Sequence, residues 1–66
     1  MNKLIQHFGS QQKLANAFNK RFGTNIRTGH IYYWIKKGIP VNRAKQIEIL
    51  TSGQFSRSYL RPDIFN

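Results

Sequence analysis

Hydrogen-bonding side chains recur at helical spacing in the segment 28–37, Thr-Gly-His-Ile-Tyr-Tyr-Trp-Ile-Lys-Lys. Residues three and four positions apart lie on the same face of a helix. One face of a helix here would carry Thr28, Gly29, Tyr32, Tyr33 and Lys36. Hydroxyl and ammonium groups donate to phosphate oxygens and to the edges of bases. The segment therefore predicts a surface helix that contacts a nucleic acid.

The opposite face of this predicted helix is apolar. Ile31, Trp34 and Ile35 form a stripe that we expect to be buried, with Trp34 in the core and not serving as a stacking platform. Arg27 precedes the helix, and its basic group can reach the phosphate backbone or a base. The stripe would hold the polar face outward.

The charge of the chain favours a polyanionic partner. Eleven Lys and Arg residues stand against only Glu48 and Asp63, which gives a net charge of +9 and a pI near 10.8. Excess lysine can also serve solubility alone, and a membrane surface is a competing polyanion. No apolar run approaches the roughly 20 residues that span a bilayer, and the basic residues are spread over every segment. We therefore expect nucleic acid.

The length and composition restrict the class of protein. The 66 residues predict a single domain, 1–66, with a small core. The chain has no cysteine and two histidines, so we expect no disulfide, no structural zinc and no cofactor. Glu48 and Asp63 are fifteen residues apart and form no paired carboxylate site, so we do not expect an enzyme. The start of the chain lacks a signal-peptide pattern, which predicts an intracellular, cytoplasmic protein.

Glycine, proline and serine divide the chain into short helices. We predict a first helix over Asn2–Phe8, stopped by Gly9. Ser10 is a good N-cap for a second helix that begins at Gln11. Its apolar positions are Leu14, Ala15, Ala17 and Phe18. The segment 19–25 is polar and contains glycine, so it predicts a connection, although the second helix could also continue through Lys20–Phe22.

The second half of the chain predicts two or three further helices. We expect Thr28 to cap the third helix, and a fourth to run from Pro40 or Val41 to Gly53. In the last stretch Ser56 is a possible cap, with Tyr59 and Leu60 as anchors. The segment 47–60 also fits a strand–turn–strand pattern, and this alternative stays open. The preferred fold is an all-α, compact bundle of four to five short helices.

The second and third helices together predict a helix-turn-helix. In this motif the first helix of the pair crosses the phosphate backbone and the second enters the major groove. Side chains at the start of the first helix of the pair, where Gln11 lies, can contact a phosphate with help from the helix dipole. We expect His30 to be structural or solvent-facing. The candidate DNA-binding residues are Gln11, Gln12, Arg27, Thr28, Gly29, Tyr32, Tyr33, Lys36 and Lys37.

Three ordered pieces of the sequence resemble a known family. They are His7–Phe18 (HFGSQQKLANAF), Ile31-x-x-Trp34, and Gly38–Gly53, which begins Gly-Ile-Pro. The chain resembles the bacteriophage Cro repressors, above all their all-helical branch and the YdaS-type antitoxin-like proteins. The ending Leu-Arg-Pro-Asp (60–63) is similar to that of the YdaS-type group. The resemblance covers nearly the whole chain.

The resemblance implies a transcriptional repressor that binds pseudo-palindromic operator DNA as a dimer, in the cytoplasm of a bacterial host cell. Six of the candidates fall on the family's contact positions: Gln11, Thr28, Gly29, Tyr32, Tyr33 and Lys36. Two features depart from the family pattern. The connection 19–25 is longer than the usual tight turn, and Arg27 stands where serine or threonine is common.

The contrasting hypothesis is an antitoxin-like protein-interaction module. Its surface would be Tyr59–Phe65, which is structural if it packs on its own core and marks a partner or dimer surface if it is exposed. One recognition helix spans only half an operator, so the DNA-binding hypothesis also implies a homodimer, weak in solution. We expect the dimer contact in the region from the fourth helix to the C-terminus.

Overall fold

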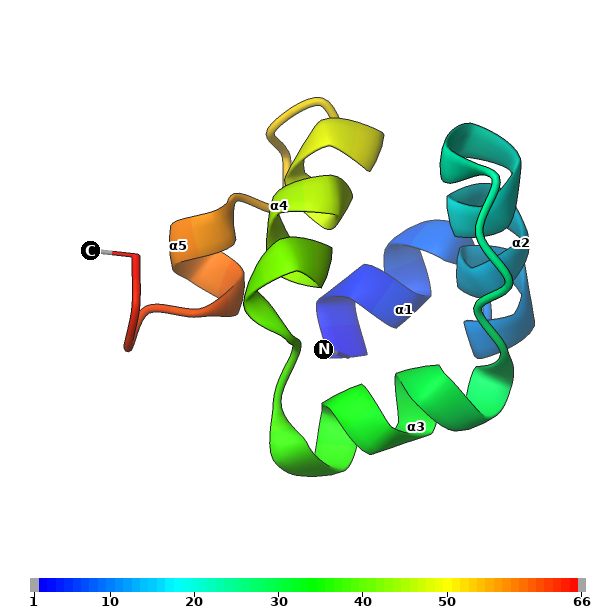
Figure 1. The fold of residues 1–66 in the computed structure, drawn as a ribbon, viewed down its shortest axis with the longest axis horizontal. Helices are drawn as coiled ribbons and strands as arrows, with labels where there is room; N and C mark the ends of the chain where they lie inside the picture. The colour runs from blue at the N-terminus through cyan, green and yellow to red at the C-terminus, as the bar shows by residue number, and fades with distance from the viewer. Residues whose placement is uncertain (1, 66) are drawn as a thin grey trace.

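The computed structural model describes residues 2–65, except for the side chain of residue 2, and those residues form five α-helices (Figure 1). The helices are α1 (Asn2–Phe8), α2 (Gln11–Phe22), α3 (Thr28–Lys37), α4 (Val41–Leu50) and α5 (Arg57–Leu60). No strand occurs within residues 2–65. The all-α prediction is therefore confirmed, and the strand–turn–strand alternative for 47–60 is wrong.

The helix boundaries follow from local chemistry. The Ser10 hydroxyl accepts a hydrogen bond from the Lys13 backbone N–H at 3.1 Å, which caps α2 as expected. The Ser56 hydroxyl caps α5 in the same way through the Tyr59 backbone N–H at 3.2 Å. Helix α4 begins at Val41, after Pro40, and ends at Leu50, three residues before the predicted end at Gly53. The chain continues there as a turn, so the predicted end was too late.

Helix α2 is longer than the preferred prediction. It continues to Phe22 and ends at Gly23, whose left-handed backbone (φ 66°) suits a residue without a Cβ. The connection is thus 23–27, shorter than the predicted 19–25. Figure 1 shows this segment running back along α2 to the start of α3. Asn19 belongs to the helix, not to the connection.

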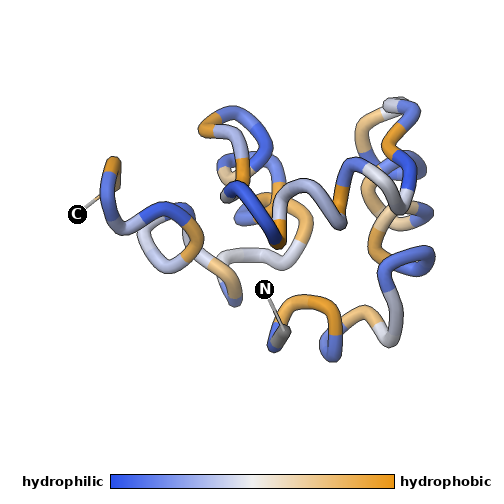
Figure 2. Tube along the Cα trace, turned by 90° about the horizontal axis from the view of Figure 1, so that it is seen from below, coloured by the Kyte–Doolittle hydropathy of each residue, from blue (hydrophilic) through white to orange (hydrophobic). Residues whose placement is uncertain are grey.

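One hydrophobic core joins all the longer helices. Its fully buried large side chains are Leu4, Leu14, Phe18, Ile31 and Ile47, which come from α1 to α4. Helix α2 packs against α1, α3 and α4 and is the centre of the bundle. Figure 2 shows apolar and polar segments alternating along the chain, as expected when each helix buries one face.

Two residues expected in the interior lie at the surface. Ile35 is 38% exposed, so the buried stripe of α3 consists of Ile31 and Trp34 only. Tyr59, predicted as an anchor, is 54% exposed, and its ring makes an edge contact with Phe55 at 5.9 Å between ring centroids. Leu60 packs on the core as predicted. The prediction was wrong for Ile35 because α3 contacts the bundle through a narrower stripe than the sequence pattern indicated.

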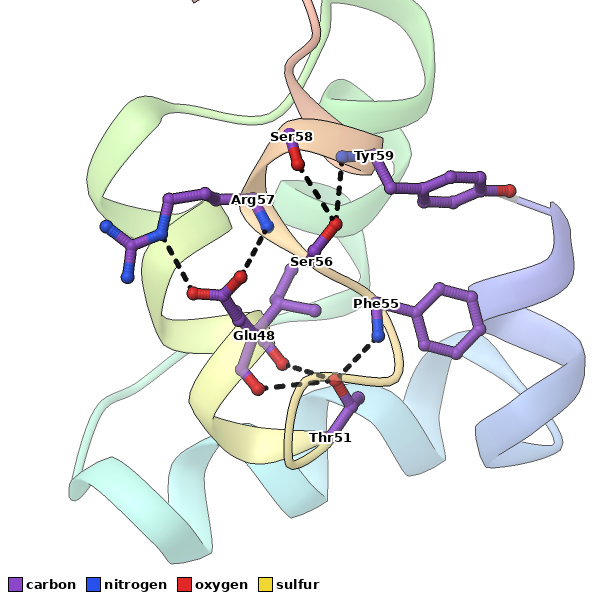
Figure 3. Close-up of polar contacts among 8 residues, drawn as sticks. Glu48, Thr51, Phe55, Ser56, Arg57, Ser58 and Tyr59 are labelled. Carbon is purple, nitrogen blue, oxygen red and sulfur yellow. Dashed lines mark hydrogen bonds and ion pairs between the residues drawn. The ribbon is translucent and has the colours of Figure 1, made fainter. Parts of the chain in front are cut away.

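A polar network fastens α5 to α4 (Figure 3). Glu48 accepts two hydrogen bonds from Arg57, one from the backbone N–H at 3.0 Å and one from Nε at 2.8 Å. The buried Thr51 hydroxyl donates to the Ile47 carbonyl and accepts from the Phe55 N–H. Further along, Arg61 donates to the Ile39 carbonyl oxygen. These contacts hold the C-terminal residues against the rest of the bundle.

Candidate nucleic-acid interface

The inner face of α3 is packed in the core, and its outer face is exposed. Ile31 and Trp34 are buried, and the Trp34 ring lies 6.0 Å from the Phe18 ring of α2, centroid to centroid. On the opposite face Tyr32 is 55% exposed and Tyr33 is 60% exposed. Two large aromatic side chains are thus exposed to solvent on a helix whose opposite face is buried in the core.

The start of α3 is built differently from the prediction. Arg27 is the N-cap residue (φ −119°, ψ 164°), and Thr28 is the first residue of the helix. The prediction that Thr28 caps α3 was therefore wrong. An arginine side chain has no acceptor, so it cannot perform the usual capping role. Thr28 is the first helical residue instead of the cap, and it is exposed.

His30 supplies the missing contact at this helix end. Its Nδ1 accepts a hydrogen bond from the Arg27 backbone N–H at 3.0 Å. This is the reciprocal half of a capping box, in which the third helical residue reaches back to the N-cap backbone. The expectation that His30 is structural or solvent-facing fits both its contact and its exposure. Sequence reasoning missed its capping role, for which the available signal was an acceptor side chain at the third helical position.

Four of the candidate residues line one surface groove. The groove has a volume of about 500 Å³ and is lined by Arg27, Thr28, Gly29, His30, Tyr33 and Trp34. A Cβ added at Gly29 would meet nothing within 4 Å, so the backbone there is open to close approach. The structure therefore brings the first turn of α3 and Tyr33 together in one concave surface with hydrogen-bonding groups and a basic residue.

The other end of α3 carries the two lysines of the candidate set. Lys36 and Lys37 are exposed in its last turn, and the Lys36 ammonium lies 5.6 Å from the centre of the Tyr32 ring. This cation–π contact places the Lys36 ammonium beside the Tyr32 ring on the exposed face of α3. Tyr32 and Lys36 thus extend the surface of the groove along the helix.

The two glutamines among the candidate residues lie on α2, outside the groove lining. Gln11 is half-buried in the first turn of α2. Gln12 is exposed, and its Nε2 donates to Asn16 Oδ1 at 2.9 Å. Their position at a helix N-terminus agrees with a phosphate contact, but Gln12 would have to exchange a hydrogen bond within its own helix to make one.

The basic charge is distributed unevenly along the chain. Residues 1–47 contain nine Lys and Arg residues and no acidic residue, whereas residues 48–66 contain two of each sign. Both acidic side chains are in ion pairs, Glu48 with Arg57 and Asp63 with Arg61. The net charge of +9 therefore lies entirely on the part that contains α2 and α3. A polyanion is attracted to that part.

These ion pairs shift three pKa values. Hydrogen bonds from the Arg57 backbone and then from its side chain lower the pKa of Glu48 below its usual value. The side-chain hydrogen bond from Arg61 lowers the pKa of Asp63, and the same contact raises the pKa of Arg61. These contacts favour the charged form of the Glu48 and Asp63 side chains.

A second groove, not predicted from the sequence, lies between α3 and α5. It has a volume of about 380 Å³ and is lined by Trp34, Ile35, Gly38, Ile39, Tyr59 and Leu60. Ile35 and Tyr59 are its exposed apolar side chains. For the C-terminal segment 59–65 the structure is mixed. Leu60 packs on the core and the Phe65 ring lies beneath Lys45 and Arg57, while Tyr59 and Ile64 are exposed.

None of the helices within residues 2–65 has the length and apolar character needed to cross a membrane.

Comparison with known proteins gives one match. A family model described as bacterial toxin YdaS matches residues 1–66, the full length of the chain. No curated protein and no solved structure matches. The earlier resemblance to YdaS-type proteins is thereby confirmed, and the match gives no support that is specific to Cro repressors.

Proposed function

The chain belongs to the YdaS family, a small helical family associated with phage, and we propose that it is a sequence-specific DNA-binding repressor. In this proposal it acts on the DNA of a bacterial host cell and blocks transcription by occupying operator sites in the manner of a Cro repressor. Helix α3 enters the major groove and α2 crosses the phosphate backbone.

One observation carries the proposal. The outer face of α3 stands in solvent over the buried pair Ile31 and Trp34, in a part of the chain that holds the whole net charge of +9. A major groove about 12 Å wide admits a helix. The exposed tyrosines offer phenol groups to phosphates or bases, and Lys36 and Lys37 offer ammonium groups to the backbone.

The size of α3 supports binding as a dimer. Its 10 residues extend about 15 Å at 1.5 Å per residue. That length corresponds to about four base pairs at 3.4 Å per step, which is too few to specify a site in a genome. We therefore propose that two chains bind related half-sites with centres about 34 Å apart.

Selection of bound sequences from random duplex DNA tests the proposal. We expect a half-site motif, repeated in inverted orientation, that binds at least about a thousandfold more tightly than random DNA. If each chain engages about four to six phosphates, the slope of log affinity against log salt is about −4 to −5 per chain. Equal affinity for all sequences would contradict the proposal.

A matched pair of tyrosine variants locates the DNA surface. Tyr33→Ala removes a 60% exposed ring from α3, and Tyr59→Ala removes a 54% exposed ring from α5. Loss of one good base contact changes discrimination by about 1–3 kcal/mol, so Tyr33→Ala should lower specific affinity by about fivefold or more. Tyr59→Ala should leave the affinity of a DNA half-site unchanged. Equal effects of the two variants on DNA affinity would show that α3 does not form the DNA interface.

A second candidate function is a protein-interaction module of the antitoxin-like type. The groove formed by Ile35 and Tyr59 favours it, because exposed apolar side chains beside a concavity are common at protein contacts. Replacement of Tyr59, an exposed residue of this groove, by Asp, followed by sedimentation, separates the two roles. The second function is the correct one if the variant no longer associates with another protein and neither the wild type nor the variant binds a specific DNA sequence.

A further inference from the structure

The start of α3 is held by a side chain that can change charge. The Arg27 backbone N–H donates to Nδ1 of His30 at 3.0 Å, and Arg27 has no side-chain acceptor to share the task. An imidazole nitrogen that accepts a hydrogen bond carries no proton. The contact therefore requires the neutral form of His30 with its proton on Nε2.

The two other helices with side-chain caps are held by groups that do not titrate. Helix α2 is capped by the hydroxyl of Ser10 and α5 by that of Ser56. Histidine is the side chain whose charge ordinarily changes between about pH 5 and about pH 8. Among these three helix starts, the one with a pH-sensitive contact is the start of the proposed recognition helix.

We infer that His30 is a positioning residue for DNA recognition, which fixes the first turn of α3 only in its neutral form. For its DNA part the inference rests on the function proposed above. His30 is assigned no base contact. It acts through the Arg27 backbone on the placement of Thr28 and Gly29, the first two residues of α3.

Protonation of His30 disfavours the helix start in two ways. The imidazolium has no acceptor, so the hydrogen bond from Arg27 is lost. The new positive charge also lies at the positive end of the helix dipole, in a groove that Arg27 lines as well. The charged or titratable groups that line the groove with His30 are Arg27 and Tyr33, and neither acidic residue of the chain is among them. No carboxylate in that lining compensates the added charge.

The expected consequence is a loss of specificity more than a loss of binding. A frayed first turn displaces Thr28 and Gly29 from the groove of the DNA, which weakens binding to the specific site. Attraction to phosphates persists, since the protein gains one positive charge. A helix cap is worth enough to change an equilibrium about fivefold. The ratio of specific to random-DNA affinity should therefore fall about fivefold on acidification from about pH 8 to about pH 5.

Two substitutions separate the acceptor from the charge. In His30→Gln the side-chain amide oxygen can accept from the Arg27 N–H, as glutamine does in capping boxes, and it does not titrate. His30→Ala has neither property. His7→Gln is the matched control, because it removes the other histidine, which packs against Phe8 and Phe55 at the end of α1.

The first measurement needs no DNA. The NMR resonance of the Arg27 amide proton is followed with pH in the full chain and its variants. In the wild type and in His7→Gln this resonance should move as the His30 ring titrates, and in His30→Gln it should stay constant. An Arg27 amide that does not respond while His30 titrates overturns the inference, whatever the protein binds.

The second measurement is the affinity ratio for the selected site and for random duplex at both pH values. The inference predicts about a fivefold fall for the wild type and for His7→Gln, no fall for His30→Gln, and a ratio that is already low at both pH values for His30→Ala. A fall of equal size in His30→Gln overturns it. A chain that binds no specific DNA sinks the proposed function, while the amide measurement still decides the capping role on its own.

Discussion

The side-chain amide of Asn19 forms hydrogen bonds with both backbone polar groups of Ile26. Nδ2 donates to the Ile26 carbonyl oxygen at 2.8 Å, and Oδ1 accepts from the Ile26 N–H at 2.7 Å. The same Oδ1 accepts from the Thr24 hydroxyl at 2.8 Å. A residue in the last turns of α2 thus holds the connection that leads to α3. We call these three hydrogen bonds the Asn19 clamp.

Substitution of Asn19 by Ala tests the clamp. The variant loses three hydrogen bonds and leaves the polar groups of the buried Ile26 unpaired, so we expect a loss of about 2 kcal/mol in the free energy of unfolding. Denaturant unfolding measures this change. Asn16→Ala is the control on the same helix. Asn16 is exposed and bonds only to Gln12, so its replacement should stay within about 0.5 kcal/mol.

The role of Asn19 also shows why the sequence predicted the connection inaccurately. Asn-Lys-Arg (19–21) reads as a loop because its residues are polar, yet these residues can equally occupy the solvent side of an amphipathic helix. The local signal for the end of α2 was Gly23, which has the left-handed conformation that a helix terminus requires. Elsewhere Gly9, Ser10 and Ser56 marked the boundaries correctly because capping depends on adjacent residues alone.

The candidate site was predictable only to the level of helix faces. The 3.6-residue period placed Thr28, Tyr32 and Tyr33 on the face opposite Ile31 and Trp34, as the structure has them. It could not determine how wide the buried stripe is, because this depends on how closely α5 approaches α3. Ile35 lies at that edge and remains 38% exposed. Whether the candidate residues bind DNA stays a prediction.

Gly29→Ala should separate stability from DNA binding. Gly29 is helical, and a methyl group at its Cβ position would enter open space. Alanine is favoured over glycine in a helix by up to about 1 kcal/mol, so thermal unfolding should occur at a higher temperature. If the DNA backbone or a base edge approaches Gly29 closely, the same methyl group should lower specific affinity several-fold.

The control for this prediction is Gly23→Ala, the same substitution at a left-handed position. Alanine there is strained (φ 66°), so the variant should be less stable by about 1 kcal/mol. A Gly29→Ala protein that is more stable and binds DNA as well as the wild type would show that the DNA does not approach this position.

The contact of Glu48 with Arg57 predicts a dependence of stability on pH. Because the pKa of Glu48 is lowered from its usual 4.5, the folded protein binds this proton less readily than the unfolded chain. The stabilisation is therefore complete above the usual value and is lost as pH falls through the lowered value. We expect Glu48→Gln to reduce the unfolding temperature at neutral pH and to approach the wild type in acid.

Asp63→Asn provides the comparison. The pKa of Asp63 is also lowered, by Arg61, but this carboxylate is more exposed than that of Glu48. Exposed ion pairs contribute little to stability, so its effect at neutral pH should be smaller. Unfolding temperatures measured from neutral to acid pH give both profiles. A constant difference between Glu48→Gln and the wild type at every pH would contradict the assignment to ionised Glu48.

Self-association should involve the C-terminal region, since two chains of net charge +9 repel each other wherever their basic parts meet. Residues 48–66 carry no net side-chain charge, and the groove between α3 and α5 exposes the apolar Ile35 and Tyr59. Tyr59→Asp should therefore weaken a dimer, by burying a charge in an apolar contact, while leaving the monomer folded because the ring is already half exposed. Tyr33→Asp should leave the dimer unchanged and weaken DNA binding. Sedimentation equilibrium with and without a palindromic duplex measures both effects, and a dimer equally sensitive to the two substitutions would place its contact elsewhere.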